Sequence, residues 1–439
     1  MVAPLKVGLA GLGTVGSAVA AMLARSRDEL TERAGRPIDL VAYASKDPPK
    51  NKSLDLSKVR KLPDPVALAR DPGIDVFVEL MGGEGDPAKS AVEAALGMGR
   101  PVVTANKALL ARHGVALAKL AEKHGAALSF EAAVAGGIPI VKTLREGLGG
   151  SRIDRIYGIL NGTCNYILTR MHQERLSFAD CLKEAQRLGY AEANPTFDIG
   201  GFDTAHKLAI LTSLAFGTEV DAEAVHVEGI ESISLADLDA AHELGYRVKL
   251  LGVAQRTQAG IEQRVHPTMV RQGSVIAEVN GVTNAVAIDS DMMELTLIGP
   301  GAGGDATSAS VVADLVDLAA GRRMPAFGRP AADLDKPRSA PMQRHEGGYY
   351  IRLAAVDRPG TVAAIATRLA DENISLESIV QRHRGVHGGE DPSKSAGPVP
   401  VILITYATTE SAVRKALAAV EAAGAIAEPP QLIRIEKNR

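Results

Sequence analysis

The first third of the chain alternates short apolar runs with longer amphipathic stretches. Continuous apolar runs of four to eight residues are typical of strands buried on both faces, and the longer periodic stretches are typical of helices. The alternation predicts an α/β fold with a doubly wound parallel sheet over residues 1–131. The predicted strands are 6–10, 38–44, 74–81, 101–104 and 127–131, and the predicted helices are 17–30, 87–98 and 108–124.

The pattern changes after residue 131. Strand-rich stretches at 153–160, 225–230 and 247–298 are mixed with helices, which predicts an α+β substrate-binding and dimerisation domain over 132–304. A helix over 305–322 is expected to pack back on the first domain. The predicted helices within the second domain include 177–188, 202–216 and 235–244.

Residues 323–344 are rich in Pro, Arg and Asp and predict a linker. Beyond it, residues 345–439 give the order strand, helix, strand, strand, helix, strand. This βαββαβ order is typical of a small ferredoxin-like module. Residues 384–398 are rich in Gly, Ser and charge, and predict a mobile loop.

Composition narrows the function classes. The chain has 439 residues, more than one hydrophobic core supports, and its net charge of -3 argues against an electrostatic nucleic-acid binder. The two cysteines, Cys164 and Cys181, argue against a disulfide scaffold. No run approaches the length of a membrane span and no leader pattern begins the chain, so we expect no membrane partner and a cytoplasmic location.

A glycine-rich turn follows the first predicted strand and opens a helix. In that context GxGxxG predicts a dinucleotide site: one glycine makes the tight turn, one lets the backbone approach a pyrophosphate, and one packs the helix closely. The alternative is a glycine turn that binds no ligand. The residues of the motif are Gly11, Leu12, Gly13, Thr14, Val15 and Gly16.

The end of the second strand bears on the choice of cofactor. Enzymes that use NAD usually place Asp or Glu there to bind the ribose hydroxyls. Here the strand ends in Ser45 and Lys46, which suit a 2′-phosphate. The sequence therefore favours NADP and leaves NAD open, as it leaves open an ordinary surface role for Lys46. The later loops with Gly82-Gly83 and Thr104 to Lys107 are expected at the same crevice.

The segment from Glu192 to Lys207 gathers carboxylates and an amine. A turn at Asn194-Pro195 and Gly200-Gly201 leads into the predicted helix, where Asp203 and Lys207 share one face. A lysine at the start of an apolar helix needs carboxylates or a ligand to compensate its desolvation. The segment therefore suits a cationic substrate group and a proton-transferring amine, although the same spacing also occurs in solvated surface pairs.

Several motifs, in this order, resemble homoserine dehydrogenase over about residues 1–325. They are the glycine motif, Val103 to Lys107, Glu131 to Pro139, Asn161 to Asn165, and Glu192 to Lys207. The resemblance implies reversible NAD(P)-dependent conversion of L-aspartate 4-semialdehyde to L-homoserine. We expect no aspartokinase segment before the dehydrogenase, and therefore no bifunctional enzyme in which the two are fused.

The resemblance also implies roles for individual residues. Lys207 is then the general acid/base, Lys107 the second active-site lysine, and Glu192 and Asp203 the carboxylates that hold the substrate's amino end, with Asp198 nearby. Backbone at Gly189 and Gly303, with Thr104, would meet the cofactor or the rim of the site. Glu131, Val134, Gly136 and Ile138 would bind a monovalent cation, usually sodium; the alternative for Glu131 is a capping carboxylate.

The C-terminal module resembles an ACT domain, most clearly in the turn from Asp357 to Gly360. Threonine is the expected effector; the alternative is a module that serves only to dimerise the enzyme. A homodimer or homotetramer is expected. Two other functions remain open at this point: an NAD(P)-dependent dehydrogenase of another small amino or hydroxy acid, and a non-catalytic ligand sensor.

Overall fold

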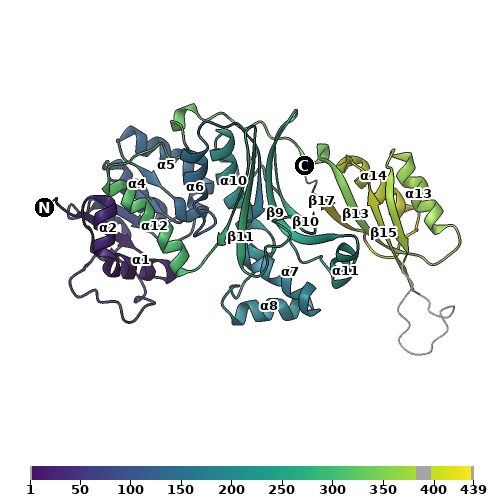
Figure 1. Cartoon of the computed structure of the whole chain (residues 1–439), viewed down its shortest axis with the longest axis horizontal. Coiled ribbons are helices and arrows are strands. Elements are labelled where there is room, and N and C mark those ends of the chain that lie inside the picture. Colours follow the sequence, from purple (N-terminus) through teal and green to yellow (C-terminus); the bar gives the residue numbers. More distant parts are fainter. Residues whose placement is uncertain (1, 382–396, 437–439) are drawn as a thin grey trace.

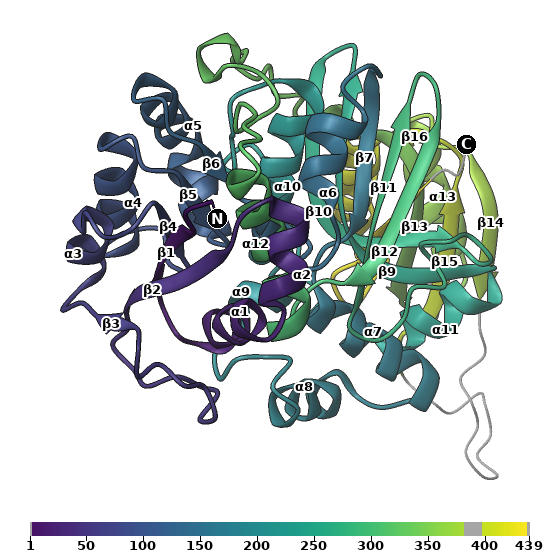
Figure 2. The same ribbon diagram turned by 60° about the vertical axis from the view of Figure 1, so that its left-hand side comes forward.

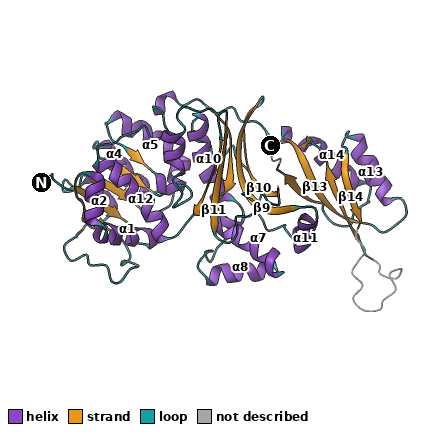
Figure 3. Cartoon of the chain, in the orientation of Figure 1, coloured by secondary structure: helices purple, strands orange, loops and turns teal. Residues whose placement is uncertain are grey.

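The computed structural model describes residues 2–381 and 397–436. Three units follow one another along the long axis of the molecule (Figure 1). An α/β unit holds the N-terminus, long strands form the centre, and a small α/β unit lies at the other end. Figure 3 shows the same division, with helices on both sides of the first sheet and the longest strands in the middle.

The N-terminal unit contains a six-stranded parallel sheet in the order β3-β2-β1-β4-β5-β6. Because the order reverses between β1 and β4, a crevice opens at the carboxyl ends of these strands. The predicted doubly wound sheet is thereby confirmed. Its strands are β1 (Leu5–Ala10), β2 (Ile38–Ala44), β3 (Arg60–Lys61), β4 (Val76–Glu79), β5 (Val102–Thr104) and β6 (Leu128–Ser129). Its helices are α1 (Thr14–Arg25), α2 (Arg27–Ala34), α3 (Pro65–Arg70), α4 (Ala88–Gly97) and α5 (Lys107–Lys123).

Two predictions for this unit were wrong in detail. The helix expected over 17–30 is two helices, because Ser26 leaves the helical conformation while its N–H still bonds to the carbonyl of Met22. The strand expected over 127–131 keeps only Leu128–Ser129. Glu131 instead begins a 3₁₀ turn (Glu131–Ala133), because its backbone N–H bonds to the Asp314 side chain rather than to a neighbouring strand.

The central unit joins helices to a long mixed sheet. Its helices are α6 (Ile140–Lys142), which runs into a π turn (Thr143–Gly147), α7 (Gly162–Glu174), α8 (Phe178–Arg187), α9 (Thr196–Ile199), α10 (Phe202–Phe216) and α11 (Leu235–Glu243). Its strands are β7 (Ile153–Ile159), β8 (His226–Val227), β9 (Tyr246–Thr257), β10 (Gly260–Arg271), β11 (Thr283–Ser290) and β12 (Glu294–Pro300).

After β12 the chain returns to the N-terminal unit. Helix α12 (Gly304–Ala319) lies beside α1 and α2 (Figure 2). Its Val311 and Leu315 are fully buried in one cluster with Val7 and Leu9 of β1. The helix therefore supplies part of the N-terminal core, although the 170 residues from 132 to 301 separate it in sequence from the rest of that unit.

The C-terminal unit confirms the predicted βαββαβ module. Its elements are β13 (Glu346–Ala355), α13 (Thr361–Asp371), β14 (Leu376–Gln381), β15 (Val399–Thr405), the short β16 (Thr408–Thr409), α14 (Glu410–Ala422) and β17 (Gln431–Ile435). The strands lie in the order β17-β13-β15-β14. Most of the mobile loop predicted over 384–398 lies outside the described residues.

One feature of this unit had not been predicted. Its edge strand β17 pairs in parallel with β10 of the central unit, through Thr268 with Arg434 and Met269 with Ile435. The two sheets therefore form one continuous 11-stranded sheet, in which nine strands follow the order β12-β11-β7-β9-β10-β17-β13-β15-β14, while β8 pairs with β10 and β16 with β13. The residues predicted as a linker are also anchored, because Asp335 bridges to Thr218 and Ser339 to Ile261.

Among the described residues, no helix combines the length and the apolar character needed to cross a bilayer.

Candidate active site

A cleft of about 860 Å³ lies between the N-terminal and central units. It collects side chains and backbone from segments far apart in the sequence. Nine of the predicted site residues line it: Val15, Lys107, Gly136, Gly189, Glu192, Asp198, Asp203, Lys207 and Gly303. The cleft therefore brings the predicted substrate residues together with part of the predicted cofactor site, whereas Ser45, Lys46 and Thr104 do not line it.

The corner between α9 and α10 places the central carboxylate. Gly201 ends this corner with a φ of 87°, a conformation that glycine adopts without strain. A Cβ there would also stand 3.1 Å from side chains of both Val227 and Val265. The tight corner directs the first turn of α10 toward the cleft, so Asp203 lies at its floor and Lys207 follows one turn later.

Asp203 is the centre of a charged cluster. One carboxylate oxygen accepts from Lys207 Nζ at 2.7 Å, and the other lies 3.2 Å from Lys107 Nζ. Burial alone would raise the pKa of Asp203, but the two ammonium groups outweigh it, so the pKa lies well below its ordinary value. Asp203 and Lys207 therefore form a buried pair in the cleft rather than a solvated surface pair.

Lys207 keeps one donor for a ligand. Its Nζ donates to the Leu160 carbonyl at 2.7 Å as well as to Asp203, and its side chain is 12% exposed. An ammonium group has three donors, so the third is available in the cleft that this residue lines. The two protein contacts fix the position of the amine before any substrate arrives.

Asn161 joins the two carboxylates of this segment. Its Nδ2 donates to Asp198 at 2.8 Å and to Asp203 at 2.9 Å, while its Oδ1 caps α7 by accepting from the Cys164 N–H. The sequence motif contained Asn161, but nothing in it assigned this bridging role. An asparagine that precedes a predicted helix was the one available signal, because it is a preferred N-cap.

Asp198 and Glu192 lie on the open side of the cluster. Burial and the nearby Asp203 raise the pKa of Asp198. Glu192 is exposed on the rim, and in the described part of the chain its carboxylate has no hydrogen-bond or ion-pair partner. Gly189, with a φ of 77°, turns the chain at the end of α8 and lines the same rim.

The glycine turn after β1 has the shape that a pyrophosphate needs. Gly11 has a φ of 94°, and a Cβ on Gly16 would stand 1.9 Å from the Gly11 carbonyl oxygen. Gly13, the N-cap of α1, has open space where a Cβ would be, and no side chain caps the helix there. The free first-turn N–H groups and the helix dipole therefore fit an anion.

Loop 45–50 covers the same turn. The Ser45 hydroxyl accepts from the Leu12 N–H and donates to the Asp47 carbonyl, and the Lys50 N–H donates to the Leu12 carbonyl at 3.2 Å. Ser45 therefore holds the loop in place, while the exposed Lys46 leaves its charge available. Lys50 places a second lysine in this loop that sequence reasoning had missed.

A buried carboxylate ties the other two cofactor loops together. Glu79, at the end of β4, accepts from the Thr104 hydroxyl at 2.6 Å and from the N–H groups of Met81 and Gly82. Asn106 donates to the Gly83 carbonyl and caps α5, the helix that begins at Lys107. Thr104 thus supports the crevice from behind and does not line the cleft.

The glycine loop before α12 closes the far wall. Gly304 packs against Thr14 and Ala18 of α1, so the N-termini of α1 and α12 lie together. The neighbouring Asn284 lines the cleft, and its amide oxygen and nitrogen are buried without a hydrogen-bond partner among the described residues. An unpaired buried amide is costly, so this wall also fits a polar ligand group.

Three of the four predicted cation ligands already accept hydrogen bonds. The Glu131 carboxylate accepts from the N–H groups of Val141 and Lys142 in α6. Burial and the neighbouring Asp314 raise the pKa of Glu131 to about 7. The carbonyls of Gly136 and Ile138 accept from the Ser310 hydroxyl and the Ile140 N–H, and Val134 is buried beside them. Within the described ranges, no group of three or more His, Cys, Asp or Glu side chains could hold a metal.

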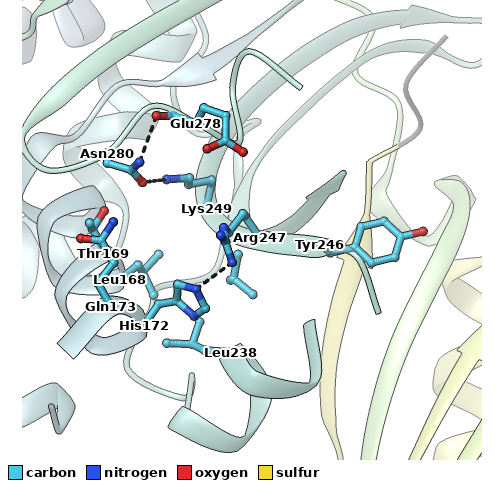
Figure 4. Close-up of a pocket in the computed structure, with 11 residues that line it drawn as sticks. Leu168, Thr169, His172, Gln173, Leu238, Tyr246, Arg247, Lys249, Glu278 and Asn280 are labelled. Carbon is cyan, nitrogen blue, oxygen red and sulfur yellow. Dashed lines mark hydrogen bonds between the residues drawn. The ribbon is translucent and has the colours of Figure 1, made fainter. Parts of the chain in front are cut away.

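A second pocket lies beside the site, between α7, β9 and α11 (Figure 4). Its buried Lys249 donates to Asn165, to the Val279 carbonyl at 2.6 Å and to Asn280, which satisfies all three donors. Burial and the adjacent Arg247 lower the pKa of Lys249 to about 8. This lysine ties down the first turn of α7, the helix that Asn161 caps.

Comparison with known proteins agrees with this geometry. Family models match residues 139–316 as homoserine dehydrogenase, 11–131 as the NAD-binding domain of homoserine dehydrogenase, and 349–422 as an ACT domain. The homoserine dehydrogenases of Neisseria gonorrhoeae and Pseudomonas aeruginosa are 43% and 44% identical, each over 99% of both chains. The chain belongs to the homoserine dehydrogenase family.

Solved homoserine dehydrogenases share the fold. The structure from Thiobacillus denitrificans superposes with a TM-score of 0.91 at 43% identity, over 99% of this chain and 98% of that one. A hyperthermophilic archaeal homoserine dehydrogenase in complex with NADPH has a TM-score of 0.61 at 28% identity and covers 72% of this chain. As a homoserine dehydrogenase, the chain is an NAD(P)-dependent oxidoreductase with a C-terminal ACT domain.

Proposed function

We propose that this homoserine dehydrogenase reduces L-aspartate 4-semialdehyde to L-homoserine, reversibly, at the Lys207–Asp203–Lys107 cluster. The reaction belongs to threonine and methionine biosynthesis. The observation that carries the proposal is that one buried carboxylate holds two lysines at 2.7 and 3.2 Å in the cleft where the cofactor loops end.

Lys207 is the proton donor in this proposal. The nicotinamide cofactor, when bound, supplies the hydride that adds to the aldehyde carbon. As the carbonyl oxygen gains negative charge, the free N–H of Lys207 donates its proton to that oxygen and completes the alcohol. Lys107 adds a second positive charge near the developing oxyanion, and the reverse reaction uses the same groups in the opposite direction.

The contacts of Asp203 favour a different role for this carboxylate from the one expected from the sequence. Asp203 was expected to hold the substrate's amino group, but its oxygens are engaged by Lys207, Lys107 and Asn161. We therefore propose that Asp203 orients the two lysines. Glu192 and Asp198, on the open side of the cleft, are left to bind the substrate's ammonium group.

The test is Lys207→Met, with Lys119→Met on the exposed face of α5 as the matched control. We expect turnover of aspartate semialdehyde to fall at least 1000-fold in Lys207→Met while NADPH affinity stays within threefold, and no change in the control. Near-normal turnover in Lys207→Met would refute the proton-donor role. A substrate panel of other small amino and hydroxy acids tests the rival dehydrogenase, and absent NADPH oxidation in the wild type would support a ligand sensor.

We propose NADP as the preferred cofactor, with NAD accepted more weakly. The support is the absence of an acid at the end of β2 and the two lysines, Lys46 and Lys50, in the loop that covers Leu12. Comparing kcat/KM for NADPH and NADH at equal ionic strength tests this. A kcat/KM for NADPH that is lower than the kcat/KM for NADH would contradict it.

Threonine is the proposed effector at the ACT domain. Its test is the wild-type rate with and without saturating threonine; an unchanged rate would contradict the proposal and favour a module that only helps assembly. Truncation near residue 340 is a poor companion test, because it would strip β17 from β10 and leave the buried Arg264 without Glu436. Substitutions in the turn from Asp357 to Gly360 are the better companion.

Three further proposals follow from the family. A monovalent cation at Glu131, Val134, Gly136 and Ile138 would have to share the oxygens of Glu131, Gly136 and Ile138 with the hydrogen bonds they already accept, and replacing sodium with choline in the assay tests it. A homodimer or homotetramer is supported by exposed apolar side chains at Met292, Met293 and Ile298, and light scattering tests it. Cell fractionation tests the proposed cytoplasmic location.

A further inference from the structure

The ACT domain and the central unit share a buried ion-pair network. Arg434 of β17 is 1% exposed and forms bidentate bonds to Glu228, at 2.7 and 3.0 Å. It also binds Glu410 of α14 at 2.7 and 3.0 Å. Arg414 of α14 adds a bond to Glu228 at 3.1 Å. Glu228 belongs to the central unit, so two arginines of the ACT domain contact the central unit at this carboxylate.

The carboxylate is firmly ionised by these partners. Burial alone would raise the pKa of Glu228, but hydrogen bonds from His226 and Arg434 outweigh it, and the pKa lies well below its ordinary value. A bidentate guanidinium–carboxylate pair fixes direction as well as distance. Both units therefore hold Glu228, and its bidentate partner, Arg434, is on the ACT side.

The backbone beside Glu228 lies against the α9–α10 corner. The Glu228 N–H bonds to the Val265 carbonyl of β10, and the Ile230 N–H bonds to the Ile199 carbonyl at 2.9 Å. Between them Gly229 approaches so closely that a Cβ would stand 2.4 Å from the Ile199 oxygen and 2.8 Å from the Gly200 Cα. Segment 227–230 is thus packed between the long sheet and the corner.

That corner carries the groups of the proposed chemistry. Asp198 is in α9, and Asp203 and Lys207 follow in the first two turns of α10. Gly201, the N-cap of α10, has Val227 at 3.1 Å and the Glu228 carbonyl at 3.5 Å from where its Cβ would be. Few atoms therefore separate the Arg434 guanidinium from the loop that positions Asp203.

We infer that Glu228 is a positioning residue through which Arg434 of the ACT domain holds the α9–α10 corner in its catalytic geometry. The inference rests on the proposed role of Asp198, Asp203 and Lys207. It gives the ACT domain a part in the basal reaction, apart from any effector, and it predicts that substrate binding at the corner is affected more than cofactor binding at the glycine turn.

The matched control is a second ion pair between the same two units. Arg352 of β13 binds the fully buried Asp237 at 2.7 and 3.1 Å, and Asp237 lies in α11, which packs mainly on β9 and α7. Arg352→Gln therefore loosens the domain junction by breaking a comparable ion pair away from the corner. Glu228→Gln removes one charge while keeping the shape of the side chain.

We expect Glu228→Gln to raise the KM for L-homoserine at least fivefold with NADP affinity within twofold of wild type, and Arg352→Gln to change neither beyond twofold. Equal effects of the two variants, or a parallel loss of NADP affinity in Glu228→Gln, would overturn the inference. If Glu228→Gln does not fold, Arg434→Lys decides: an ammonium cannot make both bidentate pairs, so KM should rise at least twofold, and an unchanged KM would refute the inference. Failure of Lys207→Met to lose turnover would instead count against the proposed function.

Discussion

Replacing Asp203 with Asn is the most direct test of how the cluster works. The amide keeps the size of the carboxylate and its oxygen can still accept hydrogen bonds, but it removes the negative charge that two lysines share. Because Asp203 is 4% exposed, water cannot replace that charge. The expected result is a correctly folded enzyme whose Lys207 is no longer held firmly against the substrate.

The magnitude follows from the contacts. A hydrogen bond to a charged group contributes about 1.5–3 kcal/mol, and a neutral acceptor retains about half of that. The bond to Lys207, whose side chain is 12% exposed, therefore loses about 0.75–1.5 kcal/mol. Lys107 is 35% exposed, so its pair with Asp203 is discounted for solvent to at most about 0.5 kcal/mol. The weakened bond from Asn161 brings the total to about 2–3 kcal/mol, which is about 30- to 150-fold in kcat/KM.

The assay is steady-state NADPH oxidation with aspartate semialdehyde, together with fluorescence titration of NADPH. The pKa of Asp203 is lowered, so the native carboxylate is charged at every pH above its unfolded value of about 3.9 and loses its stabilising charge only below that. The ratio of mutant to wild-type kcat/KM should then be flat from about pH 5 to 8. Glu219→Gln, which breaks the exposed pair with Lys119, is the control and should stay within twofold. A fall of less than threefold in Asp203→Asn, or a loss explained wholly by weaker NADPH binding, would refute the reasoning.

Three further predictions concern the cofactor site and the thiols. Gly16→Ala should lower the melting temperature and abolish NADPH binding, because its Cβ would stand 1.9 Å from the Gly11 oxygen. Gly13→Ala should melt like wild type and bind NADPH about tenfold more weakly, since only the pyrophosphate needs that space. Equal melting temperatures in the two variants would contradict this prediction. Lys46→Glu should shift the NADPH-to-NADH ratio of kcat/KM at least tenfold toward NADH, and an unchanged ratio would show that Lys46 is an ordinary surface lysine. Burial raises the pKa of Cys164 well above its ordinary value and that of Cys181 to about 11. Neither thiol should therefore react with a thiol reagent at pH 8 until the protein is unfolded, which a spectrophotometric titration measures. Rapid labelling of the native enzyme would argue against the packing of α7 and α8.

Much of the site could be predicted because its signals are local. The turn from Gly11 to Gly16 follows a strand and opens a helix, and the required backbone conformation is a property of those few residues. Asp203 and Lys207 lie one turn apart on the same helix, so their contact at 2.7 Å follows from helical spacing. Lys107, 96 residues earlier in the chain, was placed by family resemblance rather than by spacing.

Other parts of the site depend on partners that no local pattern identifies. Asn161 bridges Asp198 and Asp203 because the start of α7 lies against α9 and the first turn of α10, and Glu79 binds Thr104 because β4 and β5 are neighbours. The hydroxyl of Ser45, which was expected to lie near a phosphate, accepts a hydrogen bond from the Leu12 N–H. In each case a side chain with several donors or acceptors has several candidate partners, and the packing of distant elements selects among them.

Local patterns in the sequence were enough to predict the parallel sheet, the glycine turn and the βαββαβ order of the C-terminal module. Hydrophobic periodicity and the conformational freedom of glycine act over a few residues, so they can be read along the chain. The tertiary structure alone decided that β17 joins β10 and that Arg434 meets Glu228 beside the α9–α10 corner. An edge strand offers the same unpaired N–H and C=O groups to any neighbour, so only the packing of the two domains determines which strand it pairs with and which charges it buries.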